Sequence, residues 1–256
     1  MDLVALKRRI RRSALGPVAA RLYRLFLPRS LRERLHENAQ YDEQTIAVMR
    51  RVLARDSCAI DIGAHKGDIL EKIVAIAPAG RHIAFEPIPH LAEALRVRFP
   101  DVTVHAAALS DAPGTASFNH VVDAPAYSGL LERDFDTPDP AIERIDVNVE
   151  TLDRTIPSEV IPAFVKIDVE GGELPALRGG AAMLRRARPV VVFESGAASA
   201  AKYGATGEAI FDFFDRLGYR VSLMRWWLDH RPPFTRESFV ENFSGGVHYY
   251  FIAYPA

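Results

Sequence analysis

Cysteine and long apolar runs are scarce in this chain of 256 residues, and both absences restrict what it can be. The single cysteine, Cys58, cannot form an internal disulfide, which argues against a secreted disulfide framework and excludes a Cys-x-x-Cys zinc or redox site. No apolar run approaches the length of a membrane-spanning helix. The apolar stretch 14–20 is broken by Gly16 and Pro17 and is a poor signal-peptide core. Together these absences predict a cytoplasmic protein.

The overall composition is that of an ordinary globular protein. Hydrophobic residues make up 48% of the chain and charged residues 25%, which excludes disordered, collagen-like and coiled-coil classes. A chain of this size buries roughly 70–75% of its unfolded surface, so a single large domain needs no disulfide or metal to fold.

The net charge of −1 hides an uneven distribution. Residues 1–37 hold ten basic and three acidic residues, so this segment carries +7 and the remainder −8. A basic arm on an acidic body can bind an anionic membrane surface, which would make the protein peripheral at the membrane. The alternative is a solvated helix face packed on the main domain. We divide the chain into a basic helical N-terminal arm, residues 1–40, and a domain, residues 41–256.

Hydrophobic periodicity predicts helices in the arm and over residues 41–53, and alternating strands and helices from residue 58 onward. The predicted strands are residues 58–62, 81–85, 102–107, 164–167, 190–193, 219–223 and 248–253. The predicted helices between them are residues 67–76, 91–99, 173–186 and 211–217. Residues 115–121 and 146–149 read as an inserted antiparallel pair, and no strong helix is expected between the last two strands. The pattern indicates an α/β fold with a mostly parallel sheet.

A glycine turn follows the first predicted strand and opens the next helix. It reads Asp61-Ile-Gly63-Ala-His65-Lys-Gly67. Glycines at such a turn let the backbone pass close to a ligand and bend sharply into the helix. The spacing is not the dinucleotide fingerprint, because the third glycine is missing. Since Asp61 would repel a phosphate, the turn suits a cationic ligand.

A second acid, Glu86, closes the second predicted strand in the sequence Phe85-Glu86-Pro87. A carboxylate there can accept hydrogen bonds from both hydroxyls of a ribose. An acidic glycine turn after strand one, combined with an acid that ends strand two, is typical of S-adenosylmethionine-dependent methyltransferases. We therefore expect Glu86 to bind the ribose of that cofactor. The remaining expected cofactor-binding residues are Asp61, Gly63, His65 and Gly67.

The longest acidic motif closes the fourth predicted strand and reads Lys166-Ile-Asp168-Val-Glu170-Gly-Gly-Glu173. Strand periodicity places Lys166, Asp168 and Glu170 on one side. Ligands of open α/β sheets bind at the carboxyl ends of strands, and Glu194 ends the adjacent strand. Asp168, Glu170 and Glu194 are therefore the candidate catalytic residues, and Asp168 is also a candidate for the cofactor amine. Glu173 is expected only to complement a helix dipole.

These motifs resemble those of the FkbM family of methyltransferases. The resemblance covers about residues 58–195, and the block that starts at Lys166 is its most specific part. It rests on the two motifs above and Phe85-Glu86-Pro87, together with Ala107-Ala-Leu-Ser-Asp111, Gly114, Val149-Glu-Thr-Leu-Asp153 and Leu177-Arg-Gly179. The family more often has Asn-Val where His65-Lys66 stands.

The resemblance implies a class I, Rossmann-like methyltransferase fold with a mostly parallel seven-stranded sheet and helices on both faces. It implies S-adenosyl-L-methionine as cofactor and O-methylation of a hydroxyl on a small molecule or glycan, such as a sugar, glycolipid or other secondary metabolite. Nucleic acid is not an expected partner. The carboxylates of Asp168, Glu170 and Glu194 could instead hold a divalent cation, since an all-oxygen set suits Mg²⁺, Ca²⁺ or Mn²⁺.

Two other classes of protein remain open. Asp134-Phe-Asp136 mimics the metal motif of nucleotide-sugar-dependent glycosyltransferases, although acids beside prolines more often serve turns. A catalytically idle membrane scaffold would use the basic arm alone. A cytosine methyltransferase is excluded because Cys58 begins a buried strand, where a thiol is inert.

Several further side chains have a chemical and a structural interpretation. His248 and His230 are second-choice bases, and each is more often a structural residue. Trp226 and Trp227 could line an acceptor pocket, but core packing is favoured. The segment Arg231-Pro-Pro-Phe lacks the amide or acid of the amino-group methyltransferase motif and does not follow the fourth strand.

Overall fold

The computed structural model describes residues 29–122, 128–131 and 141–256, with side chains from residue 36 onward. The chain divides into two compact units, residues 1–43 and 44–256. The helix expected over residues 41–53 is the last part of α3 (Arg29–Val52). The helical segments expected before residue 28 and the pair Asp134 and Asp136 lie outside the described residues. The predicted domain boundary at residue 40 therefore stays a prediction.

The second unit is built on a seven-stranded sheet in the order β3-β2-β1-β7-β8-β10-β9. All neighbouring strands are parallel except β10, which runs antiparallel to both β8 and β9. The predicted α/β fold with a mostly parallel sheet is confirmed. The strands of this sheet are β1 (Cys58–Ile62), β2 (Ile83–Phe85), β3 (Thr103–His105), β7 (Pro162–Ile167), β8 (Val190–Glu194), β9 (Tyr219–Ser222) and β10 (Tyr250–Pro255).

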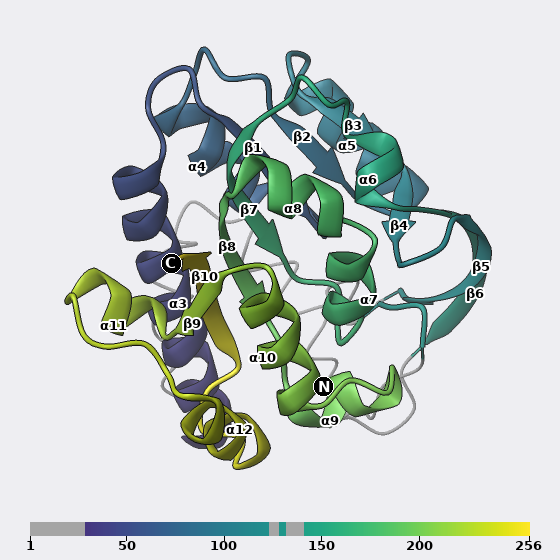
Figure 1. Ribbon diagram of the computed structural model, residues 1–256. Helices are drawn as coiled ribbons and strands as arrows, with labels where there is room; N and C mark the ends of the chain where they lie inside the picture. The colour runs from purple at the N-terminus through teal and green to yellow at the C-terminus, as the bar shows by residue number, and fades with distance from the viewer. Residues whose placement is uncertain (1–28, 123–127, 132–140) are drawn as a thin grey trace. The chain divides into compact units, whose positions relative to one another are not determined.

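Helices connect these strands, and α7, α8 and α10 lie in front of the sheet in Figure 1. The helices after α3 are α4 (Asp68–Ile76), α5 (Pro89–Arg98), α6 (Leu152–Thr155), α7 (Glu173–Arg178), α8 (Ala181–Ala187), α9 (Ala197–Lys202), α10 (Gly207–Arg216), α11 (Met224–Leu228) and α12 (Arg236–Ser244). Among the described residues, no helix has both the length and the apolarity needed to cross a membrane.

The insertion predicted after the third strand forms a separate small sheet. β5 (Gly114–Val121) and β6 (Ile142–Glu150) pair antiparallel, as expected, and β4 (Ala107–Leu109) adds a third, parallel strand. The strand predicted over residues 102–107 therefore ends early at β3, and its last residue begins β4. The chain switches here from the large sheet to the small one.

Two predicted features were wrong. The helix expected over residues 173–186 is two helices, because Gly179 and Gly180 lie against other parts of the chain between α7 and α8. A Cβ on Gly179 would lie 2.1 Å from the backbone oxygen of Ser110. The region between the last two strands, expected to lack a strong helix, holds α11 and α12. Thr235 caps the start of α12 with a capping box, and Phe239 within this helix is fully buried.

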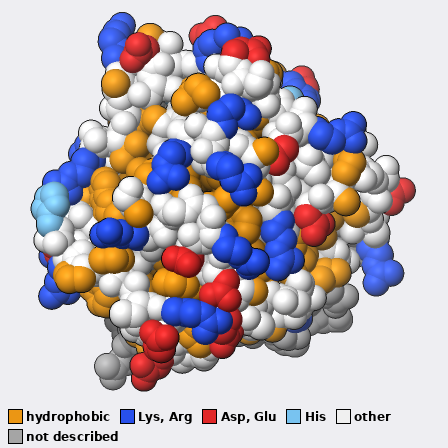
Figure 2. Space-filling model, in the orientation of Figure 1, with side chains coloured by type: hydrophobic (Ala, Val, Ile, Leu, Met, Phe, Trp, Pro, Cys, Tyr) orange, Lys and Arg blue, Asp and Glu red, His pale blue; other side chains and the backbone are white. Residues whose placement is uncertain are grey.

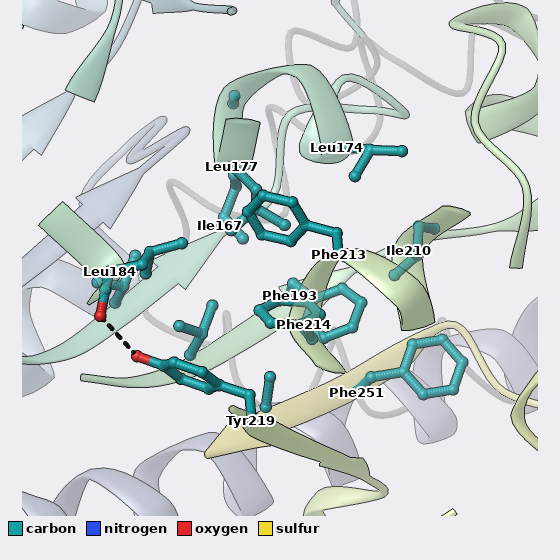
Figure 3. Packing of buried hydrophobic residues seen from close by; sticks show 14 of the residues in the cluster. Ile167, Leu174, Leu177, Leu184, Phe193, Ile210, Phe213, Phe214, Tyr219 and Phe251 are labelled. Atoms are coloured by element: carbon teal, nitrogen blue, oxygen red, sulfur yellow. Dashed lines mark hydrogen bonds between the residues drawn. The ribbon is translucent and has the colours of Figure 1, made fainter. Parts of the chain in front are cut away.

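The largest core cluster lies between the sheet and the helices α7, α8 and α10. Figure 3 shows the rings of Phe193, Phe214 and Phe251 packed together there, with the Tyr219 hydroxyl donating to the carbonyl of Leu184 at 3.2 Å. On the outside of these helices, Lys and Arg side chains are scattered among hydrophobic ones (Figure 2). Because side chains alternate along a strand, the residues between these core positions face the opposite side of the sheet.

Candidate functional site

The acidic residues singled out from the sequence meet at the carboxyl ends of neighbouring strands. Asp61 lies in β1 opposite Lys166 of β7, and Glu86 directly follows β2. Asp168 directly follows β7, and Glu194 is the last residue of β8. Since β2, β1, β7 and β8 are adjacent in the sheet, four of the predicted site residues share one edge.

The glycine turn has the sharp geometry expected of it. Gly63 and Gly67 have φ angles of 75° and 81°, in the left-handed region, and α4 begins directly after Gly67. The amides of Gly63 and Ala64 both donate to the carbonyl of Phe85, which ties the turn to the end of β2. The turn also passes close to β7, since a Cβ on Gly63 would lie 1.9 Å from the backbone oxygen of Asp168.

Asp61 is a fully buried carboxylate behind this turn. Neither of its oxygens has a hydrogen-bond partner within the described residues. Its nearest cation is the ammonium of Lys166, 3.8 Å from Oδ1. Burial raises the pKa of Asp61, and Lys166 and the nearby Leu70 amide offset only part of that rise. A buried polar group without a protein partner usually binds water or a ligand.

Glu86 is buried and held by two backbone amides. His65 donates to Oε2 at 2.8 Å, and Ile88 donates to Oε1 at 2.9 Å. Burial raises the pKa of Glu86, against these two amides and the charge of Lys166. A carboxylate has about four lone-pair sites, so each oxygen keeps one for a ligand. Glu86 thus fixes the glycine turn and still has the acceptors that two ribose hydroxyls require.

Lys166 is the buried cation of the site. Its Nζ lies 3.2 Å from Asp168 Oδ2 and 3.3 Å from the carbonyl oxygen of Gly63. Burial alone would lower the pKa of Lys166, but the carboxylates of Asp168 and Asp61 hold it above its ordinary value. Lys166 therefore remains charged and stabilises the carboxylates around it. The sequence placed Lys166 on the same side as Asp168, but its bond to the glycine turn could not be predicted.

Of the two carboxylates paired with Lys166, Asp168 is the more accessible, with a side chain 23% exposed against 1% for Asp61. Its Oδ2 also accepts a hydrogen bond of 3.0 Å from the hydroxyl of Tyr250. Tyr250 hydrogen-bonds Glu194 as well. Burial, together with the charges of Asp168 and Glu170, raises the pKa of Glu194 well above its usual range.

Glu170 lies in the turn between β7 and α7 with a φ of 59°. A side chain other than glycine or asparagine costs free energy in this left-handed conformation, and such outliers cluster at functional sites. Glu173 at the start of α7 holds this turn, because its Oε1 accepts hydrogen bonds from the backbone amides of Val169 and Gly171. Glu173 is buried, so it does more than complement the helix dipole as the sequence suggested.

Glu173 should make the stability of the fold depend on pH. Burial raises its pKa from 4.5 to about 7, although the amides of Gly171 and Val169 act in the opposite direction. Between these pH values the unfolded carboxyl ionises while the folded one keeps its proton, so its contribution to the free energy of unfolding falls by about 3 kcal/mol as pH rises. Below and above this window the contribution is constant.

The matching variant is Glu173→Gln, which keeps an oxygen for both amides but cannot ionise. Its free energy of unfolding should equal that of the wild type at low pH and exceed it by about 3 kcal/mol near neutrality. Urea denaturation across the pH range measures the difference. Substitution of the exposed Glu241 by Gln serves as the control. If the free energies of unfolding of wild type and Glu173→Gln changed with pH in the same way, the raised pKa of Glu173 would be contradicted.

The edge fits S-adenosylmethionine, the cofactor that the resemblance implies. The glycine turn brings the backbone close to a ligand, and the Nε2 atom of His65 is buried without a hydrogen-bond partner among the described residues. Burial, with the charge of Lys66, lowers the pKa of His65, so the ring is neutral. Glu86 has two acceptors left, and Asp168 offers a partly exposed carboxylate to an amine. These residues would hold the cofactor.

The histidines and tryptophans that the sequence offered as second-choice bases or pocket residues lie on the surface or in packed regions. His230 is on the surface, where its Nε2 lies 2.9 Å from a nitrogen of Arg51. Trp226 packs on Phe234 against the main core, and Trp227 packs on Tyr254 and Arg51, which favours the packing interpretation. His248 is half-buried two residues before Tyr250 and remains a second-choice base.

Two tyrosines at the site could not be found from the sequence. Tyr250 comes from β10, a predicted strand whose neighbours in the sheet could not be read from the sequence. Tyr203, directly after α9, accepts the amide of Leu131 at 3.0 Å and so holds the described segment 128–131 near Glu170. In the part of the chain that the structure describes, no three His, Cys, Asp or Glu side chains are arranged to hold a metal ion.

Comparison with solved structures finds several methyltransferases among the similar chains. Methyltransferase FkbM from Methylobacillus flagellatus is 18% identical with a TM-score of 0.47, and the match covers 79% of this chain and 44% of that one. The sugar N-methyltransferase KedS8 from Streptoalloteichus is 16% identical with a TM-score of 0.32, covering 60% and 47%. A TehB-like methyltransferase from Corynebacterium glutamicum is 14% identical with a TM-score of 0.38, covering 85% and 95%. The chain thus spans less than half of the Methylobacillus protein.

Comparison with family models identifies the chain. No curated protein matches it. The model described as "Methyltransferase FkbM domain" matches residues 61–221, more than half of the chain. The matched region contains the glycine turn, Glu86, the motif around Asp168 and Glu194. The chain therefore belongs to the FkbM family of methyltransferases.

Proposed function

We propose that the protein is an S-adenosylmethionine-dependent O-methyltransferase that acts on a hydroxyl of a sugar, glycolipid or other secondary metabolite. The observation that supports this most directly is the group of carboxyl residues at the ends of β7 and β8. A hydroxyl is a poor nucleophile at neutral pH, so its proton must be removed during methyl transfer. An uncharged amine needs no such base. The segment after β7 also lacks the Asn/Asp-Pro-Pro-aromatic motif of amino-group methyltransferases.

Each residue of the edge has a separate role in this proposal. S-adenosylmethionine, when bound, supplies an electrophilic methyl group. Glu86 accepts the ribose hydroxyls, the glycine turn and His65 border the methionine part, and Asp168 accepts the amine. Much of the acceleration comes from holding donor and acceptor in line.

Glu170 is the proposed general base. Asp168 is a weaker choice, because its Oδ2 already contacts the Lys166 ammonium at 3.2 Å and accepts the Tyr250 hydroxyl at 3.0 Å. The raised pKa of Glu194, caused by burial and by the charges of Asp168 and Glu170, makes this side chain harder to ionise and also argues against it. Glu170 lies between the partly exposed Asp168 and α7, in a backbone conformation that a residue with a purely structural role would rarely retain.

Replacement of Glu86 by Ala should weaken binding of S-adenosylhomocysteine by about 1.5–3 kcal/mol, the range for hydrogen bonds to a charged group. The free energy of unfolding should fall as well, because the amides of His65 and Ile88 lose their acceptor. Calorimetry and urea denaturation measure the two effects. Exposed Glu93→Ala in α5 is the control, and a folded Glu86→Ala protein with unchanged affinity would remove Glu86 from the ribose site.

The proposed function is tested by binding and then by transfer. Calorimetry should show binding of S-adenosylhomocysteine, and a preference for a sugar nucleotide would support the glycosyltransferase alternative instead. A screen of glycans and glycolipids with S-adenosylmethionine carrying a labelled methyl group should then give a methyl ether. A product methylated at nitrogen or carbon would overturn the assignment of O-methylation while leaving the family intact.

A further inference from the structure

Tyr250, Glu194 and Asp168 lie side by side on three adjacent strands. Tyr250 and Glu194 are register partners in the antiparallel pair of β10 and β8. Ile167 pairs with Phe193 in the parallel pair of β7 and β8, so the next residues, Asp168 and Glu194, are at the same level. Side chains directly opposite each other in a sheet are close enough to interact. The register alone therefore brings one hydroxyl and two carboxyl groups together.

The aromatic core holds this arrangement in place from the other face of the sheet. Phe193 and Phe251, the chain neighbours of Glu194 and Tyr250, are fully buried register partners with ring centroids 5.6 Å apart. Figure 3 shows both rings near Phe214, a residue of α10. Since neighbouring residues of a strand point to opposite faces, the rings anchor the backbone while the polar groups point away.

At Tyr250 a single hydroxyl hydrogen lies between two carboxyl groups. The Tyr250 hydroxyl donates this hydrogen to Asp168 Oδ2 at 3.0 Å. The same hydroxyl also hydrogen-bonds Glu194, and while its own hydrogen is on Asp168, its oxygen can take part in that second bond only as the acceptor of a proton carried by Glu194. The same oxygen, Asp168 Oδ2, also forms an ion pair with Lys166, whose Nζ lies 3.2 Å away.

The charges around Tyr250 favour the same protonation state. Asp168 and Glu194 face the Tyr250 hydroxyl. Glu170 and Glu173 act on Glu194, and Lys166 lies against Asp168. On its own segment, His248 and Tyr249 precede it. The described surroundings thus contain several carboxyl groups and one buried ammonium. Burying uncompensated negative charges is costly, so part of the cluster stays protonated.

We propose that Tyr250 is a positioning residue of the methyltransferase, whose hydroxyl links protonated Glu194 to ionised Asp168 and so fixes Asp168 for contact with the cofactor amine. This inference rests on the function proposed above. It gives Glu194 a role as proton donor to Tyr250, and it leaves Glu170 as the carboxylate that receives the acceptor proton.

Infrared spectroscopy of the full chain without ligand tests the proton on Glu194. Near neutral pH the wild type should show the carbonyl band of an un-ionised carboxyl group that Glu194→Gln removes. Tyr250→Phe should shift that band, because Glu194 loses its hydrogen-bond acceptor. Tyr254→Phe, the same substitution farther along β10 and beside Arg220, should leave the band in place.

Calorimetry with S-adenosylhomocysteine tests the positioning of Asp168. Tyr250→Phe should weaken binding about ten- to a hundredfold, the range for one lost hydrogen bond to a charged group. In an Asp168→Asn background the same substitution should cause no further loss, because Tyr250 acts through Asp168. Tyr254→Phe should leave the affinity unchanged.

Two results would overturn the proposal. One is a carboxyl band unchanged by Glu194→Gln or by Tyr250→Phe. The other is an affinity for S-adenosylhomocysteine that is unchanged in folded Tyr250→Phe protein, or that Tyr250→Phe lowers equally in the Asp168→Asn background. If Tyr250→Phe fails to fold by circular dichroism, the comparison of wild type with Glu194→Gln still decides the proton location. Absence of S-adenosylhomocysteine binding would instead contradict the proposed function, and the infrared measurement would remain independent of it.

Discussion

Glu170→Gln is expected to lower kcat by about 10²–10⁴ while leaving the affinity for S-adenosylhomocysteine nearly unchanged, since this is the usual contribution of a general base. The amide keeps the size and much of the hydrogen bonding of the carboxylate but cannot accept the acceptor proton. The measurement uses an acceptor obtained from the glycan and glycolipid screen, with calorimetry on the same preparations. Exposed Glu241→Gln in α12 controls for loss of an acid elsewhere.

A glycine at the same position separates chemistry from stability. The φ of 59° at Glu170 is left-handed, so Glu170→Gly removes the carboxylate and relieves the backbone at once. Glu170→Gly should be at least as stable as the wild type in urea denaturation and as inactive as Glu170→Gln. An inactive but stable variant is the signature of a residue kept for function. Full turnover by Glu170→Gln would place the base elsewhere, and His248 would be tested next.

The main sheet could be predicted from the sequence because its parallel strands are continuous apolar runs separated by helical patterns. β1 matches the predicted residues, and β7 and β8 begin or end within two residues of them. The edge was predictable for the same reason, since Glu86, Asp168 and Glu194 follow or end such strands and Asp61 is the last residue but one of β1. A parallel sheet brings the carboxyl ends of its strands together wherever they come in the chain.

What the sequence could not predict depends on contacts between distant segments. Tyr250 reaches the site only because β10 inserts between β8 and β9, and strand pairing leaves no mark on a single sequence. The break between α7 and α8 depends on the Ser110 carbonyl near Gly179. The length of β3 depends on the small sheet that takes the following residues. Each of these is a tertiary effect that local propensity does not encode.

The glycine turn illustrates the same point at a single residue. The sequence suggested that a side chain at Gly63 would occupy space meant for a ligand. The structure gives a different reason: a Cβ there would lie 1.9 Å from the backbone oxygen of Asp168. The amide of Asp168 also donates to the carbonyl of Ile62, so the two strand ends are already joined and have little freedom to separate.

Gly63→Ala is therefore expected to lower the free energy of unfolding by more than about 3 kcal/mol. A left-handed φ costs a non-glycine residue roughly 1–2 kcal/mol, and displacing the backbone at Asp168 adds strain and weakens the bonds that Lys166 makes there. Affinity for S-adenosylhomocysteine should also fall, because a side chain at Gly63 displaces both the glycine turn and the backbone of Asp168. Urea denaturation and calorimetry measure both.

Two other glycines separate the contributions to that loss. Gly204 has a φ of 67° and open space where a Cβ would stand, so Gly204→Ala should show the cost of the backbone conformation alone. Gly114 has open space and no left-handed φ, so Gly114→Ala should be nearly neutral. Gly63→Ala combines both effects and should be the most destabilised of the three. If it loses no more stability than Gly204→Ala, the close approach of β1 and β7 does not constrain this position, and the loss of cofactor binding would have to come from the ligand side of the turn.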